Sequence, residues 1–153
     1  MTASRHPNLT GVAIGGRGLV IEGPSGSGKS SLALALIDRG ATLIGDDGLE
    51  LVVESGALVA HPPEQTRGLL EIRNVGIVAF DYTQAPVALL LSLADDAPRF
   101  VDRAATRELA GQRVPAIAFR AGDAVQAIRA EQALLKYGLP HRAAGPILRS
   151  DIA

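Results

Sequence analysis

The stretch from Gly23 to Ser30 constrains this chain more than any other part of its sequence. It reads Gly-Pro-Ser-Gly-Ser-Gly-Lys-Ser and fits the pattern G-x-x-x-x-G-K-[S/T] of a phosphate-binding loop, or P-loop. An apolar segment precedes it at Gly18–Glu22, and a run of helix formers follows it at Ser31–Arg39. A strand, a glycine-rich loop and a helix in this order predict an α/β fold with the loop at the edge of its sheet.

The residue types in the loop suit the phosphates of a nucleotide. Glycines let consecutive backbone N–H groups point at phosphate oxygens, and the following helix adds the positive end of its dipole. We expect Lys29 to reach the β- and γ-phosphates and the Ser30 hydroxyl to bind Mg²⁺. The sequence predicts ATP or GTP binding through Gly23, Pro24, Ser25, Gly26, Ser27, Gly28, Lys29 and Ser30.

Two adjacent carboxylates, Asp46 and Asp47, follow the next predicted strand at Thr42–Ile44. In a right-handed strand–helix–strand unit the chain returns to the same edge of the sheet, so both acids should emerge beside the phosphates. One carboxylate could then hold Mg²⁺ while the other accepts a proton from an attacking hydroxyl. A turn with two solvated acids is the alternative interpretation.

The rest of the chain is richer in predicted strands than in helices, which favours a mixed sheet. The apolar run Val87–Leu93 is typical of a strand buried on both faces. A second helix is expected over Asp123–Lys136, with Asp123 as its N-cap. We expect further strands at Gly11–Ile14, Leu49–Glu54, Ala57–His61, Leu69–Ile72, Val75–Phe80 and Val114–Phe119, and one face of the second helix near Val125, Ile128, Gln132 and Leu135.

Length and composition limit the possible classes of protein. The 153 residues suit one domain, 1–153, with a core at about 8–137 and a loosely ordered tail at 138–153. A net charge of -1 lacks the basic excess of most nucleic-acid binders, and the absence of cysteine excludes disulfides and thiol nucleophiles. No signal peptide or run long enough to span a membrane is evident, so we expect a cytoplasmic protein without a membrane partner.

A later motif resembles a known family. The segment Glu71-Ile72-Arg73-Asn74-Val75-Gly76-Ile77 closely resembles the Glu-Ile-Arg-Gly-x-Gly-Ile motif of bacterial HPr kinase/phosphorylase. The P-loop followed by Leu43-Ile44-Gly45-Asp46-Asp47 resembles the same family, and the likeness spans roughly residues 8–137. The chain is similar to the short, alphaproteobacterial form, which lacks an N-terminal domain. The resemblance implies a P-loop kinase-like α/β fold with a mixed, strand-rich sheet, similar to phosphoenolpyruvate carboxykinase.

The resemblance also implies an activity. Members of this family are ATP- and Mg²⁺-dependent kinases that phosphorylate a serine of HPr, a small phosphocarrier protein of the phosphotransferase system, and they form hexamers. Many also reverse the reaction by phosphorolysis. The implied roles are proton acceptance by Asp47, phosphate binding by Lys29, charge neutralisation by Arg99, and Mg²⁺ binding by Ser30 and Glu71. With Asp47 as the proton acceptor, Asp46 is the carboxylate of the pair that we expect to hold Mg²⁺.

Three departures from the family pattern weaken the expectation of phosphorolysis most. Asn8 occupies the position of a catalytic histidine, with His6 two residues away, and Asn74 replaces a glycine. In the late loop 118–123, Asp123 stands where the family has an arginine. Two alternatives therefore remain beside the HPr kinase: a small-molecule P-loop kinase, although no lid segment is evident, and a nucleotide-binding regulator that no longer transfers phosphate.

Overall fold

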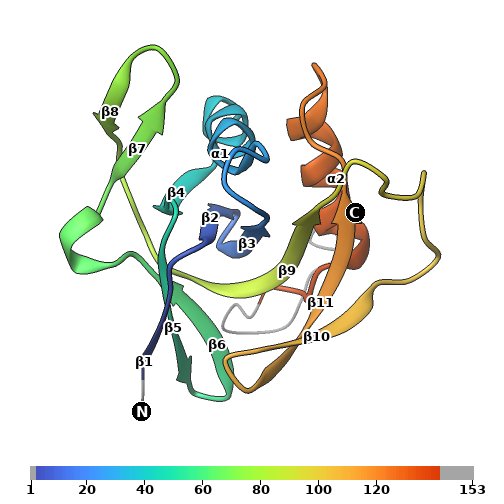
Figure 1. Cartoon of the computed structure of the whole chain (residues 1–153). Coiled ribbons are helices and arrows are strands. Elements are labelled where there is room, and N and C mark those ends of the chain that lie inside the picture. The colour runs from blue at the N-terminus through green and yellow to red at the C-terminus, as the bar shows by residue number, and fades with distance from the viewer. Residues whose placement is uncertain (1–2, 142–153) are drawn as a thin grey trace.

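The long apolar strand β9 (Ala85–Leu93) joins the two halves of a curled mixed sheet (Figure 1). The computed structural model describes residues 3–141. The first residues of β9 pair antiparallel with β6, and the rest of the strand lies parallel to β3 and β11. Its middle residues are buried, as its uninterrupted apolar run predicts for a strand covered on both faces.

Within residues 3–141, nine strands form the large sheet and two form a separate hairpin. The main path of the sheet runs in the order β1-β5-β6-β9-β3-β2-β4, and β11 and then β10 extend it from β9. The predicted mixed, strand-rich sheet is therefore confirmed, whereas β1 and β10 were not predicted. Besides β9, the strands are β1 (Ala3–His6), β2 (Leu9–Ile14), β3 (Arg17–Glu22), β4 (Thr42–Gly45), β5 (Leu49–Glu54), β6 (Ala57–His61), β7 (Leu69–Ile72), β8 (Gly76–Ala79), β10 (Ala105–Leu109) and β11 (Gln112–Phe119).

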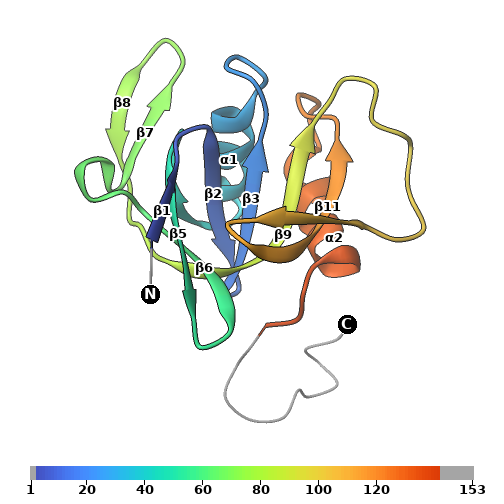
Figure 2. The ribbon, with the colours of Figure 1, turned by 60° about the horizontal axis from the view of Figure 1, so that its bottom comes forward.

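Two helices, α1 (Lys29–Asp38) and α2 (Gln126–Tyr137), lie against each other on one face of this sheet (Figures 1 and 2). Successive strand residues point to opposite faces, so Leu19 and Ile21 of β3 pack under the helices while Val20 packs on the other side. The second side is closed by the curl of the sheet toward β5, β6 and β11. Neither helix has the length or apolar run that a bilayer crossing requires.

Strand β2 lies between β3 and β4 and pairs antiparallel with both. Strands β3 and β4 therefore run in the same direction, and their carboxyl ends meet the beginning of β2. In register terms, Leu9 faces Glu22 at the end of β3, and Gly11 faces Gly45 at the end of β4. The P-loop and the acid pair thus emerge at one edge, as the sequence predicted, with one strand between them.

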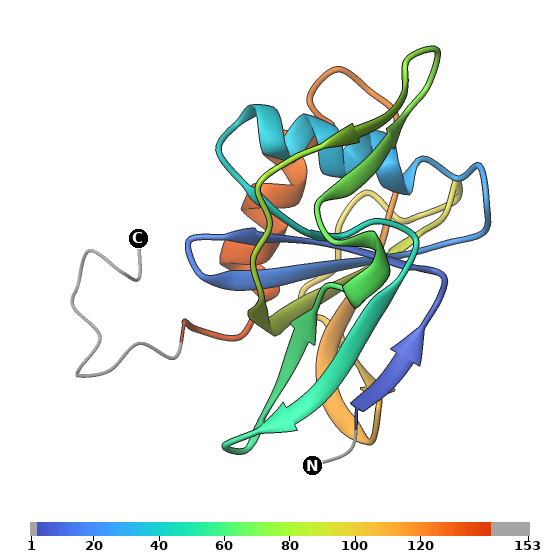
Figure 3. The same cartoon turned by 90° about the vertical axis from the view of Figure 1, so that its left-hand side faces the viewer.

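The hairpin of β7 and β8 projects from the sheet beside α1 (Figure 3). Its turn contains Asn74 with a φ of 71°, a left-handed conformation that asparagine tolerates better than most residues. This geometry explains why an asparagine can replace the glycine of the family motif.

The second helix differs from its prediction. It begins at Gln126 with Val125 at the N-cap, and Asp123 instead accepts the backbone N–H of Val125 through its carboxylate, at 3.0 Å. The predicted apolar face is exposed, because the helix packs through small residues that allow close approach. Exposed are Val125, Ile128 and Leu135, whereas Ala127, Ala130, Ala133 and Leu134 are buried.

The first residues of the predicted loose tail are not loose. The Arg17 side chain donates to the backbone oxygen of Leu139 at 2.7 Å, and the Leu139 N–H donates to the oxygen of Ala88 at 2.9 Å. Residues 138–141 are thus held against β3 and β9, and the remainder of the predicted tail, 142–153, lies outside the described residues.

The neighbouring leucines Leu134 and Leu135 test the orientation of α2. Leu134 is 2% exposed and Leu135 is 52% exposed, so the same substitution should have different effects at the two positions. We expect Leu134→Ala to lower the free energy of unfolding by about 2–5 kcal/mol and Leu135→Ala to change it by less than about 0.5 kcal/mol. Denaturant unfolding measures both, and equal losses would contradict this orientation.

Candidate active site

The P-loop lines a cleft of about 620 Å³ together with the acid pair and the β7–β8 hairpin. The structure therefore gathers most of the predicted site residues around one space, although the motifs are far apart in the sequence. The predicted residues that line the cleft are Ser25, Gly26, Gly28, Lys29, Ser30, Asp46, Asp47 and Glu71.

The loop takes a conformation that depends on glycine. Gly26 and Gly28 have φ values of 82° and 105°, in the left-handed region that L side chains rarely adopt. Gly28 is the N-cap residue of α1, so the first N–H groups of the helix, which have no partner within it, face the same cleft. This is the arrangement in which a helix N-terminus binds an anion.

The ammonium of Lys29 is held by the loop itself. Lys29 is 7% exposed, and its Nζ donates to the backbone oxygens of Gly23 at 2.6 Å and Pro24 at 3.3 Å. Within residues 3–141 no carboxylate pairs with this ammonium. A buried cation without a counter-charge favours an anionic ligand in the adjoining cleft.

The carboxylate of Asp46 accepts three hydrogen bonds from three different segments. The Ser30 hydroxyl donates to Oδ1 at 2.6 Å, the Thr10 hydroxyl donates to Oδ1 at 3.2 Å, and the Glu71 N–H donates to Oδ2 at 3.3 Å. The contact between Ser30 and Asp46 joins two of the predicted Mg²⁺ ligands, and Glu71, the third, lines the same cleft.

Thr10 is a site residue that the sequence analysis missed. It is fully buried on β2, and its hydroxyl accepts the backbone N–H of Asp47 at 3.0 Å besides donating to Asp46. A threonine within an apolar strand gives only a weak signal, because its importance depends on β2 lying between β3 and β4.

Both acids of the pair face the cleft. Asp47 is exposed and has a φ of 54°, because the extended strand β4 ends at Gly45 and the chain turns at once. The alternation of side chains along a strand therefore does not separate Asp46 from Asp47 here. The Asp46 carboxylate accepts three hydrogen bonds, whereas the Asp47 side chain is exposed at the cleft.

The donor set fits Mg²⁺ bound together with phosphates. No group of three or more histidine or acidic side chains within the described part of the chain is positioned to hold a metal by itself. Mg²⁺ commonly takes one or two protein carboxylates and completes its shell with water and substrate phosphates. Ser30, Asp46 and Glu71 beside the P-loop provide such a partial set.

Arg99 is not part of this cleft. It lies in the loop after β9 and lines a second cavity with α2, so its predicted role at the transferring phosphoryl group stays a prediction. Neither Asn8 nor His6 lines the cleft either. The His6 ring instead lies 2.9 Å from the Ser4 hydroxyl on the edge strand β1.

An ion pair fixes the strand that leads into the loop. Both Glu22 oxygens accept hydrogen bonds from Arg107 of β10, at 2.8 and 3.0 Å. Burial acts to raise the pKa of Glu22, but the hydrogen bonds from Arg107 and Ser92 and the Arg107 charge outweigh it, so the pKa is lowered. Because Glu22 directly precedes Gly23, this pair anchors the start of the P-loop to the far hairpin of the sheet.

Comparisons with known proteins relate the chain to one family. The family model described as the HPr serine kinase C-terminal domain matches residues 2–84, which include the whole lining of the cleft. An HPr kinase/phosphorylase of Clostridium botulinum is 45% identical over 73 residues, 48% of this chain and 23% of that protein. One of Clostridium perfringens is 45% identical over 67 residues, 44% of this chain and 22% of that protein.

The fold also matches a solved structure. The HPr(Ser) kinase/phosphatase from Coxiella burnetii superimposes with a TM-score of 0.71 at 26% identity, covering 86% of this chain and 91% of that one. The chain spans about a quarter of the length of the curated relatives it matches. The sequence comparison and the fold comparison therefore relate the chain to the same family.

The hydrogen bond between Thr10 and Asp46 can be tested by a double-mutant cycle. We expect Thr10→Val to lower the free energy of unfolding by about 1–3 kcal/mol in the parent, because it leaves buried polar groups without a partner. In an Asp46→Ala background the loss should be smaller, with a coupling of about 0.5–3 kcal/mol. Thr106→Val on exposed β10 is the control, and additive losses would contradict the contact.

Proposed function

The chain belongs to the family of the HPr serine kinase C-terminal domain, and on this premise we propose that it is an ATP- and Mg²⁺-dependent kinase of a serine in an HPr-type phosphocarrier protein. The observation that carries the proposal is the hydrogen bond between P-loop Ser30 and Asp46, in a cleft that also holds Lys29 and Asp47. The groups predicted to bind phosphate, hold Mg²⁺ and accept the proton thus line one cleft, which supports the proposal.

The phosphates would bind along the P-loop. The first N–H groups of α1 and the Lys29 ammonium would donate to phosphate oxygens, and Arg73, which also lines the cleft, would add a second positive charge. Ser30, Asp46 and Glu71 would hold Mg²⁺. When bound there, Mg²⁺ would supply positive charge that offsets the charge of the phosphates.

Transfer itself would move one phosphoryl group and one proton. The serine Oγ of the phosphocarrier attacks the γ-phosphorus, the bond to the β,γ-bridging oxygen breaks, and ADP leaves. The hydroxyl proton goes to the Asp47 carboxylate, whose exposed position beside the loop lets a second protein reach it. Asp46 is less suited to this step, because three donors already engage its oxygens.

We further propose that forward transfer exceeds phosphorolysis, the attack of phosphate on phosphoserine that releases pyrophosphate. Asn8 replaces a catalytic histidine of the family, and Asp123 replaces an arginine in the late loop that is linked in the family to dephosphorylation. The Asp123 carboxylate forms an ion pair with Arg129 of α2 at 3.1 Å, which connects the loop before α2 to the helix.

An ATP turnover assay with and without an HPr-type protein tests the function. ADP should form rapidly only with the phosphocarrier and Mg²⁺, and phosphoserine-HPr with phosphate should release little pyrophosphate.

Lys29→Ala should weaken ATP binding about ten- to a hundredfold, since a charge-assisted contact contributes about 1.5–3 kcal/mol. Its melting temperature should hardly rise with Mg-ATP, in contrast to the parent and to Arg5→Ala as control. Equal shifts in all three proteins would refute binding at the P-loop.

The roles of the two acids can be separated by single-turnover transfer. Asp47→Asn keeps the size of the side chain but cannot accept a proton, so we expect a rate loss of about 10²–10⁴ with ATP affinity within a few fold. Asp46→Asn should instead raise the Mg²⁺ concentration needed, because a neutral amide replaces the charge beside Ser30. A near-parent rate for Asp47→Asn with loss of transfer for Asp46→Asn would mean that the roles are reversed.

A further inference from the structure

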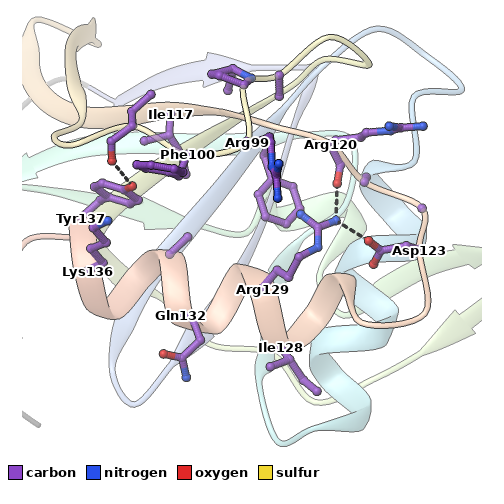
Figure 4. Close-up of a pocket in the computed structure, with 18 residues that line it drawn as sticks. Arg99, Phe100, Ile117, Arg120, Asp123, Ile128, Arg129, Gln132, Lys136 and Tyr137 are labelled. Atoms are coloured by element: carbon purple, nitrogen blue, oxygen red, sulfur yellow. Dashed lines mark hydrogen bonds and ion pairs between the residues drawn. The ribbon is translucent and has the colours of Figure 1, made fainter.

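The second cavity, of about 960 Å³, lies between the loop 97–101, the end of β11 and helix α2 (Figure 4). It adjoins the P-loop. The Ala121 Cβ, which lines this cavity, is 3.8 Å from the place that a Cβ on Gly28 would occupy, and Gly28 lines the phosphate cleft. The cavity and the cleft at the P-loop therefore adjoin each other at Gly28.

The cavity exposes an aromatic ring, although the chain as a whole contains few aromatic residues. Phe100 is 73% exposed, although aromatic residues make up only 3% of the sequence. The loop that carries it is tied to α2, because the Tyr137 hydroxyl donates to the backbone oxygen of Val101. The Lys136 ammonium lies 5.9 Å from the centre of the Phe100 ring and 5.0 Å from that of Tyr137.

The charge of the cavity is strongly positive. Its one acid, Asp123, pairs with Arg129, whose guanidinium also lies 4.6 Å from the centre of the Phe119 ring. The other three cations, Arg99, Arg120 and Lys136, have no ion-pair partner within residues 3–141. Exposed aromatic surface beside unpaired cations suits a ligand that combines a flat ring system with negative charge.

A P-loop binds only the phosphates of a nucleotide, so the base and ribose must lie beyond it. We propose that this cavity binds the nucleoside part of the nucleotide whose phosphates occupy the cleft, with the base stacked on the Phe100 ring; this rests on the proposed function. Lys136 would then lie at the base end of the ligand, beside the Phe100 ring. A cavity of this size suits a small-molecule ligand, and the site lies outside residues 2–84, which the family model matches.

A tryptophan probe tests where the base lies, because the chain contains no tryptophan. In Phe100→Trp, ATP and ADP should quench the emission by stacking, whereas inorganic triphosphate, which has no base, should leave it nearly unchanged. Leu135→Trp places the same probe on the exposed face of α2, away from the cavity, and should respond to neither. Binding of ATP without a change at position 100, or an equal response to triphosphate, would overturn the proposal.

Affinities separate this inference from the proposed function. Phe100→Ala should weaken ATP binding about five- to a hundredfold and leave triphosphate binding within about twofold, since stacking on an aromatic ring involves the base alone. Lys29→Ala should weaken both ligands, and Leu135→Ala neither. If Lys29→Ala has no effect, the P-loop function fails. If Lys29→Ala weakens both ligands and Phe100→Ala weakens neither or both equally, only the nucleoside site is overturned.

Discussion

The three hydrogen bonds to the Asp46 carboxylate are the contact on which the site depends. They come from the first turn of α1, from the beginning of β2 and from the backbone of β7, so one side chain connects the P-loop helix, the sheet and the projecting hairpin. A charged acceptor strengthens each of these bonds, and removing it would leave the buried Thr10 hydroxyl with one partner fewer. The cleft has its shape because these segments converge on one carboxylate.

The rest of the sheet supports this contact from behind. Strand β9 is buried between β3 and β11 and lies under both helices, which fixes the strand that leads into the P-loop. The ion pair between Glu22 and Arg107 holds the end of β3 from the opposite hairpin. The cleft and the second cavity both border the P-loop, which follows β3. The strands that hold β3 in place therefore also position the two spaces relative to each other.

Much of this arrangement could be predicted from local patterns. The P-loop could be read from consecutive residues, because its glycines and Lys29 act through the backbone and side chains of one short segment. The emergence of Asp46 and Asp47 at the same edge followed from the handedness of a strand–helix–strand unit. The buried face of α2 was predicted wrongly: its alanines pack on the sheet, whereas Ile128 and Leu135 are exposed. A prediction from hydrophobicity alone favours large apolar side chains over alanine as the buried residues.

The sequence by itself determined the phosphate-binding loop, the acid pair, the mixed sheet and the likeness to one family, because each of these can be recognised from short segments of consecutive residues. Only the tertiary structure decided that β2 lies between β3 and β4 and brings Thr10 to Asp46, and that Arg99 faces a cavity beside α2 rather than the cleft. These features depend on which strands become neighbours and how a loop packs on a helix. Strand pairing over long sequence separations is decided by the burial of the whole core, and no local pattern of residues encodes it.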